Sequence, residues 1–117
     1  MKTILIVEDT ELNIDLLTQL LEDDYTLLIA KDGNQGVNMA MTKKPDLILM
    51  DISLPVLDGY EATRQIRKIL PSIPIIGLSA HAMEGHKQKA QEAGCNDYLT
   101  KPVNDSLLFE MLQRYLG

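Results

Sequence analysis

Leu47-Ile48-Leu49-Met50 is a run of four apolar residues without polar alternation, preceded by Pro45-Asp46 and followed by Asp51. The run has the length of a strand, and the lack of alternation indicates a strand that is buried on both faces. Such strands occur in parallel sheets whose two faces are both covered by helices. The segment therefore predicts an α/β fold with a central parallel sheet.

Strand-length apolar segments alternate with helix-period segments along the rest of the chain. Strict alternation of five strands and five helices predicts a doubly wound α/β sandwich. Right-handed crossovers then favour the flavodoxin-like (βα)5 arrangement, a five-stranded parallel sheet in the order 2-1-3-4-5. We expect the other strands at residues 3–7, 25–30, 75–78 and 97–100, and the helices at residues 11–21, 32–42, 58–70, 83–93 and beyond Asn104.

The apolar stripes of the helices indicate which side of each helix faces the sheet. In the first helix Leu12, Leu16 and Leu20 form one apolar stripe and Leu17 and Leu21 lie beside it, which indicates an amphipathic helix. In the third helix we expect Ile69 to face inward. The fourth helix carries only Met83 and two alanines as apolar residues, so we expect it to be loosely held.

Composition and charge narrow the classes of protein. The chain has 117 residues, which corresponds to one domain, and 45% of them are apolar, as in ordinary globular proteins. The 17 acidic residues against 11 basic ones give a net charge of −6, which disfavours binding to nucleic acid or to an anionic membrane. The apolar runs are too short to span a membrane, no signal peptide is recognisable, and the single cysteine cannot form an internal disulfide. We therefore expect a cytoplasmic protein.

Polar residues follow four of the expected strands, at the point where each strand ends. They are Glu8-Asp9 after the first strand, Asp51 after the third, Ser79 after the fourth and Lys101 after the fifth. In open parallel sheets, ligands bind beyond the carboxyl ends of the strands, at the switch point between neighbouring crossovers. We therefore expect three carboxylates, a hydroxyl and an ammonium group to converge at one edge of the sheet.

The chemistry of this group of side chains indicates a metal-dependent phosphoryl site. Three carboxylates repel one another unless a cation lies among them, and an all-oxygen donor set suits Mg²⁺. A lysine and a hydroxyl nearby can bind an anion, so the group contains the parts that position and neutralise a transferring phosphoryl group. With a carboxylate as the nucleophile, the product is an acyl phosphate.

The same residues resemble the receiver domain of two-component response regulators, and the resemblance covers the whole chain. The matching positions are Glu8-Asp9, Asp51 within the segment 50–59, Ser79 and Lys101-Pro102. No single position is specific, but all of them occur in order at expected strand ends. Glu8 and Ser79 stand where Asp and Thr are more frequent in the family, and both keep the required oxygen.

The resemblance implies a Mg²⁺-dependent phosphoacceptor in a phosphorelay. Asp51 is the residue that accepts a phosphoryl group from a phosphohistidine on a histidine kinase or a histidine phosphotransfer protein. Asp9, Asp51 and the backbone carbonyl of Ser53 are the expected Mg²⁺ ligands, and Glu8 assists through water.

The resemblance also implies roles for residues around the phosphoryl group. Lys101 and Ser79 are expected to hold the phosphoryl oxygens, together with the backbone N–H groups of Ile52 and Ala80. Tyr98 matches the aromatic residue that turns inward when the hydroxyl moves.

Two further implications concern rate and backbone geometry. Ser53 and His81 occupy positions that tune the lifetime of the phosphoryl group in this family. The Lys101-Pro102 peptide bond is expected to be cis.

Two other classes of protein fit the fold less well. An aspartyl-phosphate phosphohydrolase needs a second acid two residues after the nucleophile, where this chain has Ser53, and it also needs a cap that the chain has no residues to build. A flavodoxin-like flavin binder needs small neutral residues in its first loop, where Glu8-Asp9-Thr10-Glu11 would repel a phosphate.

We expect residues 1–117 to form a single receiver domain that acts alone and is not an enzyme beyond its own phosphorylation and dephosphorylation. Met1 lies directly before the first strand and Gly117 directly after the last helix, which favours a complete chain without an effector domain. The alternative is a receiver segment cut from a hybrid histidine kinase. The expected output is a change of protein partner, whose identity the sequence does not indicate, and the expected state is a monomer or weak dimer.

Overall fold

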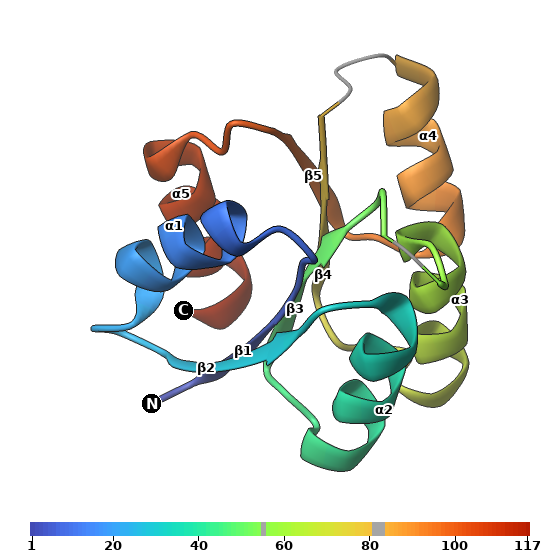
Figure 1. Ribbon diagram of the computed structural model, residues 1–117, viewed down its shortest axis with the longest axis horizontal. Coiled ribbons are helices and arrows are strands. Elements are labelled where there is room, and N and C mark those ends of the chain that lie inside the picture. The colour runs from blue at the N-terminus through green and yellow to red at the C-terminus, as the bar shows by residue number, and fades with distance from the viewer. Residues whose placement is uncertain (55, 81–83) are drawn as a thin grey trace.

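The computed structural model describes residues 1–54, 56–80 and 84–117 and has the predicted architecture (Figure 1). Five parallel strands form one sheet in the order β2-β1-β3-β4-β5. The strands are β1 (Thr3–Val7), β2 (Thr26–Ala30), β3 (Leu47–Asp51), β4 (Ile75–Ser79) and β5 (Asp97–Thr100). The helices are α1 (Glu11–Leu21), α2 (Gly33–Lys43), α3 (Gly59–Ile69), α4 (Glu84–Ala93) and α5 (Asp105–Leu116). No helix within the described ranges is long and apolar enough to cross a membrane.

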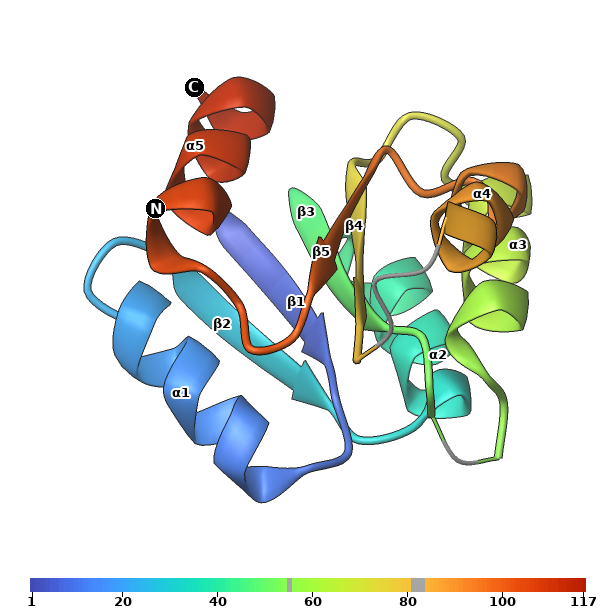
Figure 2. The ribbon, with the colours of Figure 1, turned by 90° about the horizontal axis from the view of Figure 1, so that it is seen from above.

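Helices cover both faces of the sheet. Figure 2 shows α1 and α5 on one face and α2, α3 and α4 on the other. The side chains of the central strands therefore enter two separate cores: Ile48 and Met50 pack on the side of α2 and α3, whereas Leu47 and Leu49 pack on the side of α1 and α5. This explains why residues 47–50 show no polar alternation, because neither face of β3 meets water.

The structure buries only part of the apolar face predicted for α1. Ile14, Leu17 and Leu21 are the buried residues of α1, whereas Leu12 is 67% exposed and Leu16 is 51% exposed. Two adjacent stripes of α1 are apolar, and the one that contains Leu17 and Leu21 packs into the core on this face of the sheet. Ile69, at the last turn of α3, is also exposed rather than buried.

A side chain caps the N-terminus of the helices α2, α3 and α5. The side chains of Asp32, Asp58 and Asn104 accept hydrogen bonds from backbone N–H groups three residues further on, at 2.8, 3.0 and 2.9 Å. Each bond satisfies one of the N–H groups that the first turn of a helix leaves unpaired. The caps fix where α2, α3 and α5 begin, and therefore how the loops before them are directed.

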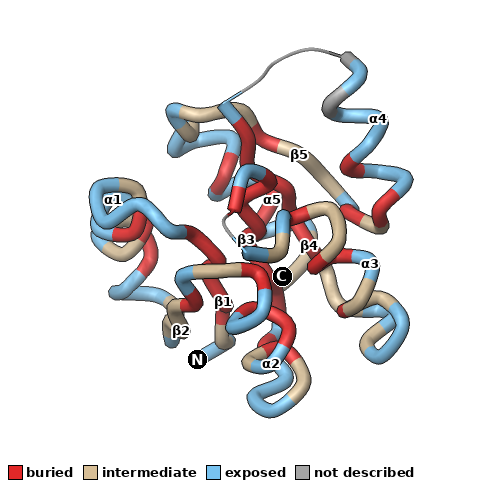
Figure 3. The backbone as a smooth tube through the Cα atoms, turned by 45° about the vertical axis from the view of Figure 1, so that its right-hand side comes forward, coloured by how far each residue is buried: buried red, intermediate tan, exposed pale blue. Residues whose placement is uncertain are grey.

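The fourth helix is attached mainly at its C-terminal end. Ala90 and Ala93 are buried, while Figure 3 shows exposed backbone along the outer side of α4. Just beyond the helix, Arg67 of α3 donates from Nε to the carbonyl of Gly94 at 2.8 Å. Met83, which was expected to be apolar support for this helix, lies outside the described residues.

Candidate functional site

The carboxyl ends of the strands bring the predicted polar residues to one edge of the sheet. Asp51 ends β3 and Ser79 ends β4, while Glu8 and Lys101 come directly after β1 and β5. The sheet hydrogen bonding continues past the strand ends, since Glu8 N–H donates to the Ala30 carbonyl at 2.9 Å and Lys101 N–H donates to the Ser79 carbonyl at 2.7 Å. Backbone pairing therefore fixes the positions from which these side chains project.

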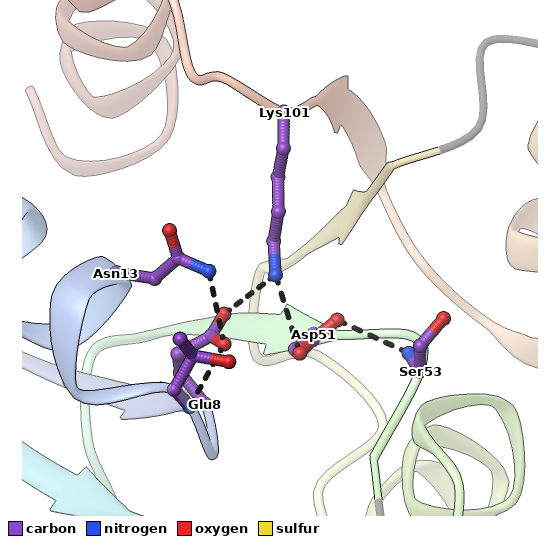
Figure 4. Close-up of polar contacts among 6 residues, drawn as sticks. Glu8, Asn13, Asp51, Ser53 and Lys101 are labelled. Carbon is purple, nitrogen blue, oxygen red and sulfur yellow. Dashed lines mark hydrogen bonds and ion pairs between the residues drawn. The ribbon is translucent and has the colours of Figure 1, made fainter.

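Lys101 joins two of the carboxylates. Its Nζ atom lies 2.8 Å from Glu8 Oε2 and 3.2 Å from Asp51 Oδ2, so the ammonium group lies between the two acids (Figure 4). The Glu8 side chain is fully buried and Asp51 is 3% exposed. Charges this deeply buried need a partner, and one lysine supplies it for both of them.

The three predicted acids form a compact cluster. Glu8, Asp9 and Asp51 can each offer one carboxylate oxygen such that the three oxygens lie within 4.8 Å of one another. Asp9 is exposed, so the cluster opens to solvent on its side. A set of carboxylate oxygens with access to water fits a hard divalent cation such as Mg²⁺.

Burial and charge set the protonation of the site. Burial is the main cause that raises the pKa of Asp51 from 3.8 to about 6, and the neighbouring charge of Glu8 raises it further, against the lowering effects of the Ser53 N–H and Lys101. For Lys101, burial lowers the pKa, but the hydrogen bond to Glu8 and the charge of Asp51 outweigh it and the pKa is raised. At neutral pH the lysine is therefore charged and the Asp51 carboxylate is mostly ionised.

Backbone and amide donors hold the two buried acids in place. Ser53 N–H donates to Asp51 Oδ1 at 3.1 Å, and Thr10 N–H donates to Glu8 Oε1 at 3.3 Å. Asn13 Nδ2 also donates to Glu8 Oε1, at 3.4 Å. Asn13 could not be singled out from the sequence, because nothing in the polar stripe of an amphipathic helix distinguishes a residue that reaches back to the end of the preceding strand.

The other predicted residues are placed as follows. Ser79 and Ile52 are buried and Ala80 is exposed, all at the same edge of the sheet. Tyr98 is half-buried on β5, opposite Gly77 of β4. The Lys101-Pro102 peptide bond is cis, as predicted. His81 lies outside the described residues.

Comparisons with known proteins agree with the fold. The response regulator receiver domain family matches residues 4–113. This doubly wound fold with an acidic cluster and a lysine at its carboxyl edge is that of the signalling modules that the sequence resembles. The chain belongs to the response regulator receiver domain family and is a receiver domain of two-component systems.

Relatives of the chain include a stand-alone regulator and part of a much longer kinase. The polar-differentiation response regulator DivK of Brucella anthropi is 37% identical, with 99% of this chain and 97% of that protein covered. The hybrid signal transduction histidine kinase I of Dictyostelium discoideum is 43% identical over 93% of this chain, which is 7% of that protein.

Solved structures show the same fold. The receiver domain of the sensor histidine kinase PA1611 from Pseudomonas aeruginosa PAO1, determined with a magnesium ion in its active-site cleft, has a TM-score of 0.92 and 42% identity, with 99% of this chain and 98% of that chain covered. The receiver domain of Ssk1 from Saccharomyces cerevisiae, in complex with the histidine phosphotransfer protein Ypd1, has a TM-score of 0.91 and 35% identity, with 97% and 88% covered.

Proposed function

We propose that Asp51 is the phosphoacceptor of this receiver domain. The observation that carries the proposal is the position of its carboxylate, which ends a buried strand, contacts the Lys101 ammonium at 3.2 Å and belongs to the acidic cluster with Glu8 and Asp9. The proposed nucleophile thus has the Lys101 ammonium on one side and carboxylate oxygens that can bind a metal ion on the other. Phosphoryl transfer depends on this kind of positioning and charge neutralisation.

We assign Mg²⁺ to the cluster, with Asp9, Asp51 and the Ser53 carbonyl as ligands and Glu8 assisting through water. When bound, the ion supplies positive charge that reduces repulsion between the carboxylates and the incoming phosphoryl oxygens. The magnesium ion in the cleft of the related PA1611 receiver domain supports this assignment.

The transfer step uses groups of this chain and a phosphohistidine of the donor. A carboxylate oxygen of Asp51 attacks the phosphorus, the P–N bond to the donor imidazole breaks, and the leaving nitrogen retains its electron pair and takes a proton. The product is an acyl phosphate on Asp51. Lys101, the Ser79 hydroxyl and the N–H groups of Ile52 and Ala80 stabilise the phosphoryl oxygens by charge and hydrogen bonding.

Mass spectrometry after incubation with acetyl phosphate and Mg²⁺ tests this function. We expect the wild-type protein to gain one phosphoryl group and Asp51→Asn to gain none. Asp58→Asn is the matched control, because Asp58 is an exposed helix cap close in sequence and asparagine caps equally well. An unmodified wild-type protein, or a phosphorylated Asp51→Asn protein, would contradict the proposal.

We propose that the phosphoryl donor is a histidine kinase or a histidine phosphotransfer protein. The exposed Leu12 and Leu16 on α1 form an apolar patch, and Leu16 also lines a cavity of about 470 Å³ together with Leu20, Val103, Glu8 and Lys101 of the site. An apolar patch next to a reactive group fits a protein that must dock to deliver its phosphohistidine. The complex of the related Ssk1 receiver domain with Ypd1 supports this class of partner.

We propose that phosphorylation changes the surface formed by α4, β5 and α5, and through it the binding of a downstream protein. Tyr98 is half-buried and borders a cavity of about 260 Å³ that Lys87 of α4 and Leu107 of α5 also line. An inward turn of Tyr98, coupled to movement of Ser79 toward the phosphoryl group, would change this cavity. Ser53 and His81 are the proposed positions that tune phosphoryl lifetime.

We infer that residues 1–117 act as one stand-alone cytoplasmic receiver domain, monomeric or weakly dimeric, and not as an enzyme with a substrate of its own. Coverage of nearly the whole of DivK supports the stand-alone arrangement, whereas the match to a short part of a hybrid kinase supports the alternative of a receiver segment. The size of the endogenous protein on an immunoblot distinguishes them. A band much larger than 13.1 kDa would contradict the stand-alone arrangement.

A further inference from the structure

The first turn of α2 contacts the loop that follows Asp51. Gly33 is buried, and a Cβ atom placed on it would lie 1.9 Å from the backbone oxygen of Leu57 and 2.8 Å from Leu57 Cβ. Any side chain at residue 33 would therefore overlap backbone atoms, which can move only if the loop between β3 and α3 moves. The absence of a side chain allows the loop to lie directly on the helix.

The position of Gly33 is itself fixed. Asp32 caps α2 through its bond to Gln35 N–H, and Lys31 N–H donates to Gln35 Oε1 at 3.1 Å. One turn further on, a Cβ atom on Gly36 would lie 3.0 Å from the methyl groups of Val7 in β1. The first turn of α2 is therefore a firm support, held by its cap and by the sheet.

The loop is held in a conformation that it would not favour alone. Val56 has φ 69°, which is uncommon for a β-branched residue, and its side chain is 80% exposed, so packing of that side chain does not offset the strain. At the end of the loop, a Cβ atom on Gly59 would lie 2.2 Å from the Asp51 carbonyl oxygen. The contact of Leu57 with Gly33 lies between these two constrained points.

This loop carries the backbone that surrounds the reactive carboxylate. Ser53 N–H donates to Asp51 Oδ1 at 3.1 Å, and the Ser53 carbonyl is a proposed metal ligand. We propose that Gly33 is a positioning residue, which acts through Leu57 to keep the loop after Asp51 in the conformation that binds Mg²⁺ and accepts the phosphoryl group. The inference rests on the proposed function and adds a contact from a helix outside the site.

Gly33→Ala tests the inference, with Gly36→Ala as the matched control in the same helix. Gly36→Ala crowds only side-chain methyl groups, which can shift by a few tenths of an ångström. We expect Gly33→Ala to raise the Kd for Mg²⁺, measured by calorimetry, at least about tenfold, as loss of a supporting contact does at other metal sites. Phosphorylation by acetyl phosphate should slow in parallel, while Gly36→Ala stays within about twofold of wild type.

Two results would overturn the inference: wild-type Mg²⁺ affinity and phosphorylation rate in Gly33→Ala, or equal losses in both variants. Thermal unfolding of each variant shows whether the protein still folds, and so distinguishes loss of the fold from displacement of the loop. A wild-type protein that binds no Mg²⁺ and takes up no phosphoryl group would contradict the proposed function instead, so the two failures are distinguishable.

If Gly33→Ala does not fold, a second pair of variants tests the positioning role of the first turn of α2. Asp32→Asn removes the charge of the α2 cap but keeps the capping oxygen, whereas Asp32→Ala removes both. We expect Asp32→Ala to raise the Mg²⁺ Kd about twofold or more above that of Asp32→Asn, because the first turn that supports Leu57 frays. Equal Kd values in the two variants would contradict a positioning role for this turn.

Discussion

At the residue scale, the site is a group of charged side chains with a net negative charge. Glu8 and Asp51 are both buried and share the Lys101 ammonium, while Asp9 adds a further carboxylate at the open side. The three acids and one lysine leave an excess of negative charge at one point on the sheet. Burial, together with the nearby charge of Glu8, makes ionised Asp51 unfavourable for folding in the absence of a cation, and raises its pKa to about 6.

This cost predicts an unusual pH dependence. Because the pKa of Asp51 is higher in the folded protein than its usual 3.8, the folded state holds the proton more tightly, and the contribution of this group to stability falls as pH rises from about 4 to about 6. In Mg²⁺-free buffer we expect Asp51→Asn not to lose this stability as pH rises. At pH 7 its free energy of unfolding should exceed that of the wild type by up to about 3 kcal/mol. Urea unfolding of both proteins between these pH values measures the difference.

The difference between the two proteins is the informative quantity, because groups away from the site titrate equally in both. It should be small at pH 4, where Asp51 is largely protonated, and should grow toward pH 7. Parallel stability curves for wild type and Asp51→Asn would show that burial does not raise the pKa of this carboxyl.

The acids and the lysine of the site could be predicted from the sequence, but their supporting contacts could not. Glu8, Asp51 and Lys101 each adjoin an apolar strand, and parallel strands place such positions together whatever the helices do. Asn13 of α1 reaches back to Glu8 at the end of the preceding strand, and Gly33 lies against Leu57 on a loop distant in the chain. Those contacts depend on how each helix is rotated and how each loop lies, which local patterns leave undetermined.

At the scale of the element, α1 shows where local pattern is insufficient. Both of its apolar stripes satisfy the helical period, so hydrophobicity alone does not determine which one faces the sheet. The structure buries Ile14, Leu17 and Leu21 and leaves Leu12 and Leu16 exposed. The strands, by contrast, could be predicted almost to the residue, since an all-apolar segment has no alternative orientation to choose.

The exposed stripe of α1 predicts a defect that is specific to protein donors. We expect Leu12→Asp and Leu16→Asp to slow phosphotransfer from the best donor in a panel of phosphorylated histidine phosphotransfer proteins at least about tenfold. Phosphorylation by acetyl phosphate should not change, because neither residue belongs to the acidic cluster. Both proteins should keep their stability within about 0.5 kcal/mol, since the substitutions lie on the surface.

Ile69→Asp is the control for this experiment. Ile69 is 53% exposed, close to the 51% of Leu16, but it lies at the end of α3, on the opposite face of the sheet. Equal slowing in Ile69→Asp and in the α1 variants would indicate a general effect of added charge rather than docking on α1.

At the scale of the whole molecule, the sheet joins the site to the two hydrophobic cores. The acids follow β1 and β3, the central pair of neighbouring strands on which both cores pack, and the lysine follows β5. The site is therefore attached to strands whose side chains enter both cores. A ligand that binds there stabilises the complete fold rather than one element.

Mg²⁺ should accordingly raise the stability of the protein as a unit. At a concentration a hundredfold above its Kd, a ligand of the folded state adds about 2.7 kcal/mol to the free energy of unfolding. We expect a single unfolding transition that shifts to higher urea with Mg²⁺. Asp9→Asn should keep the Mg²⁺-free stability, because Asp9 is exposed, and should lose most of the shift. If Mg²⁺ shifts the unfolding transition of Asp9→Asn as much as that of the wild type, Asp9 is not a metal ligand.

The direction of the last helix has a consequence for how this domain can be built into larger proteins. α5 starts where β5 ends and runs back against the strands, so both chain ends lie on the side of the molecule where the strands begin (Figure 2). The acidic cluster and Lys101 lie on the other side, at the carboxyl ends of the strands. A neighbouring domain joined at either end would leave the route of the phosphoryl donor open, which explains in spatial terms how the same fold serves both as a whole regulator and as a segment of a long kinase.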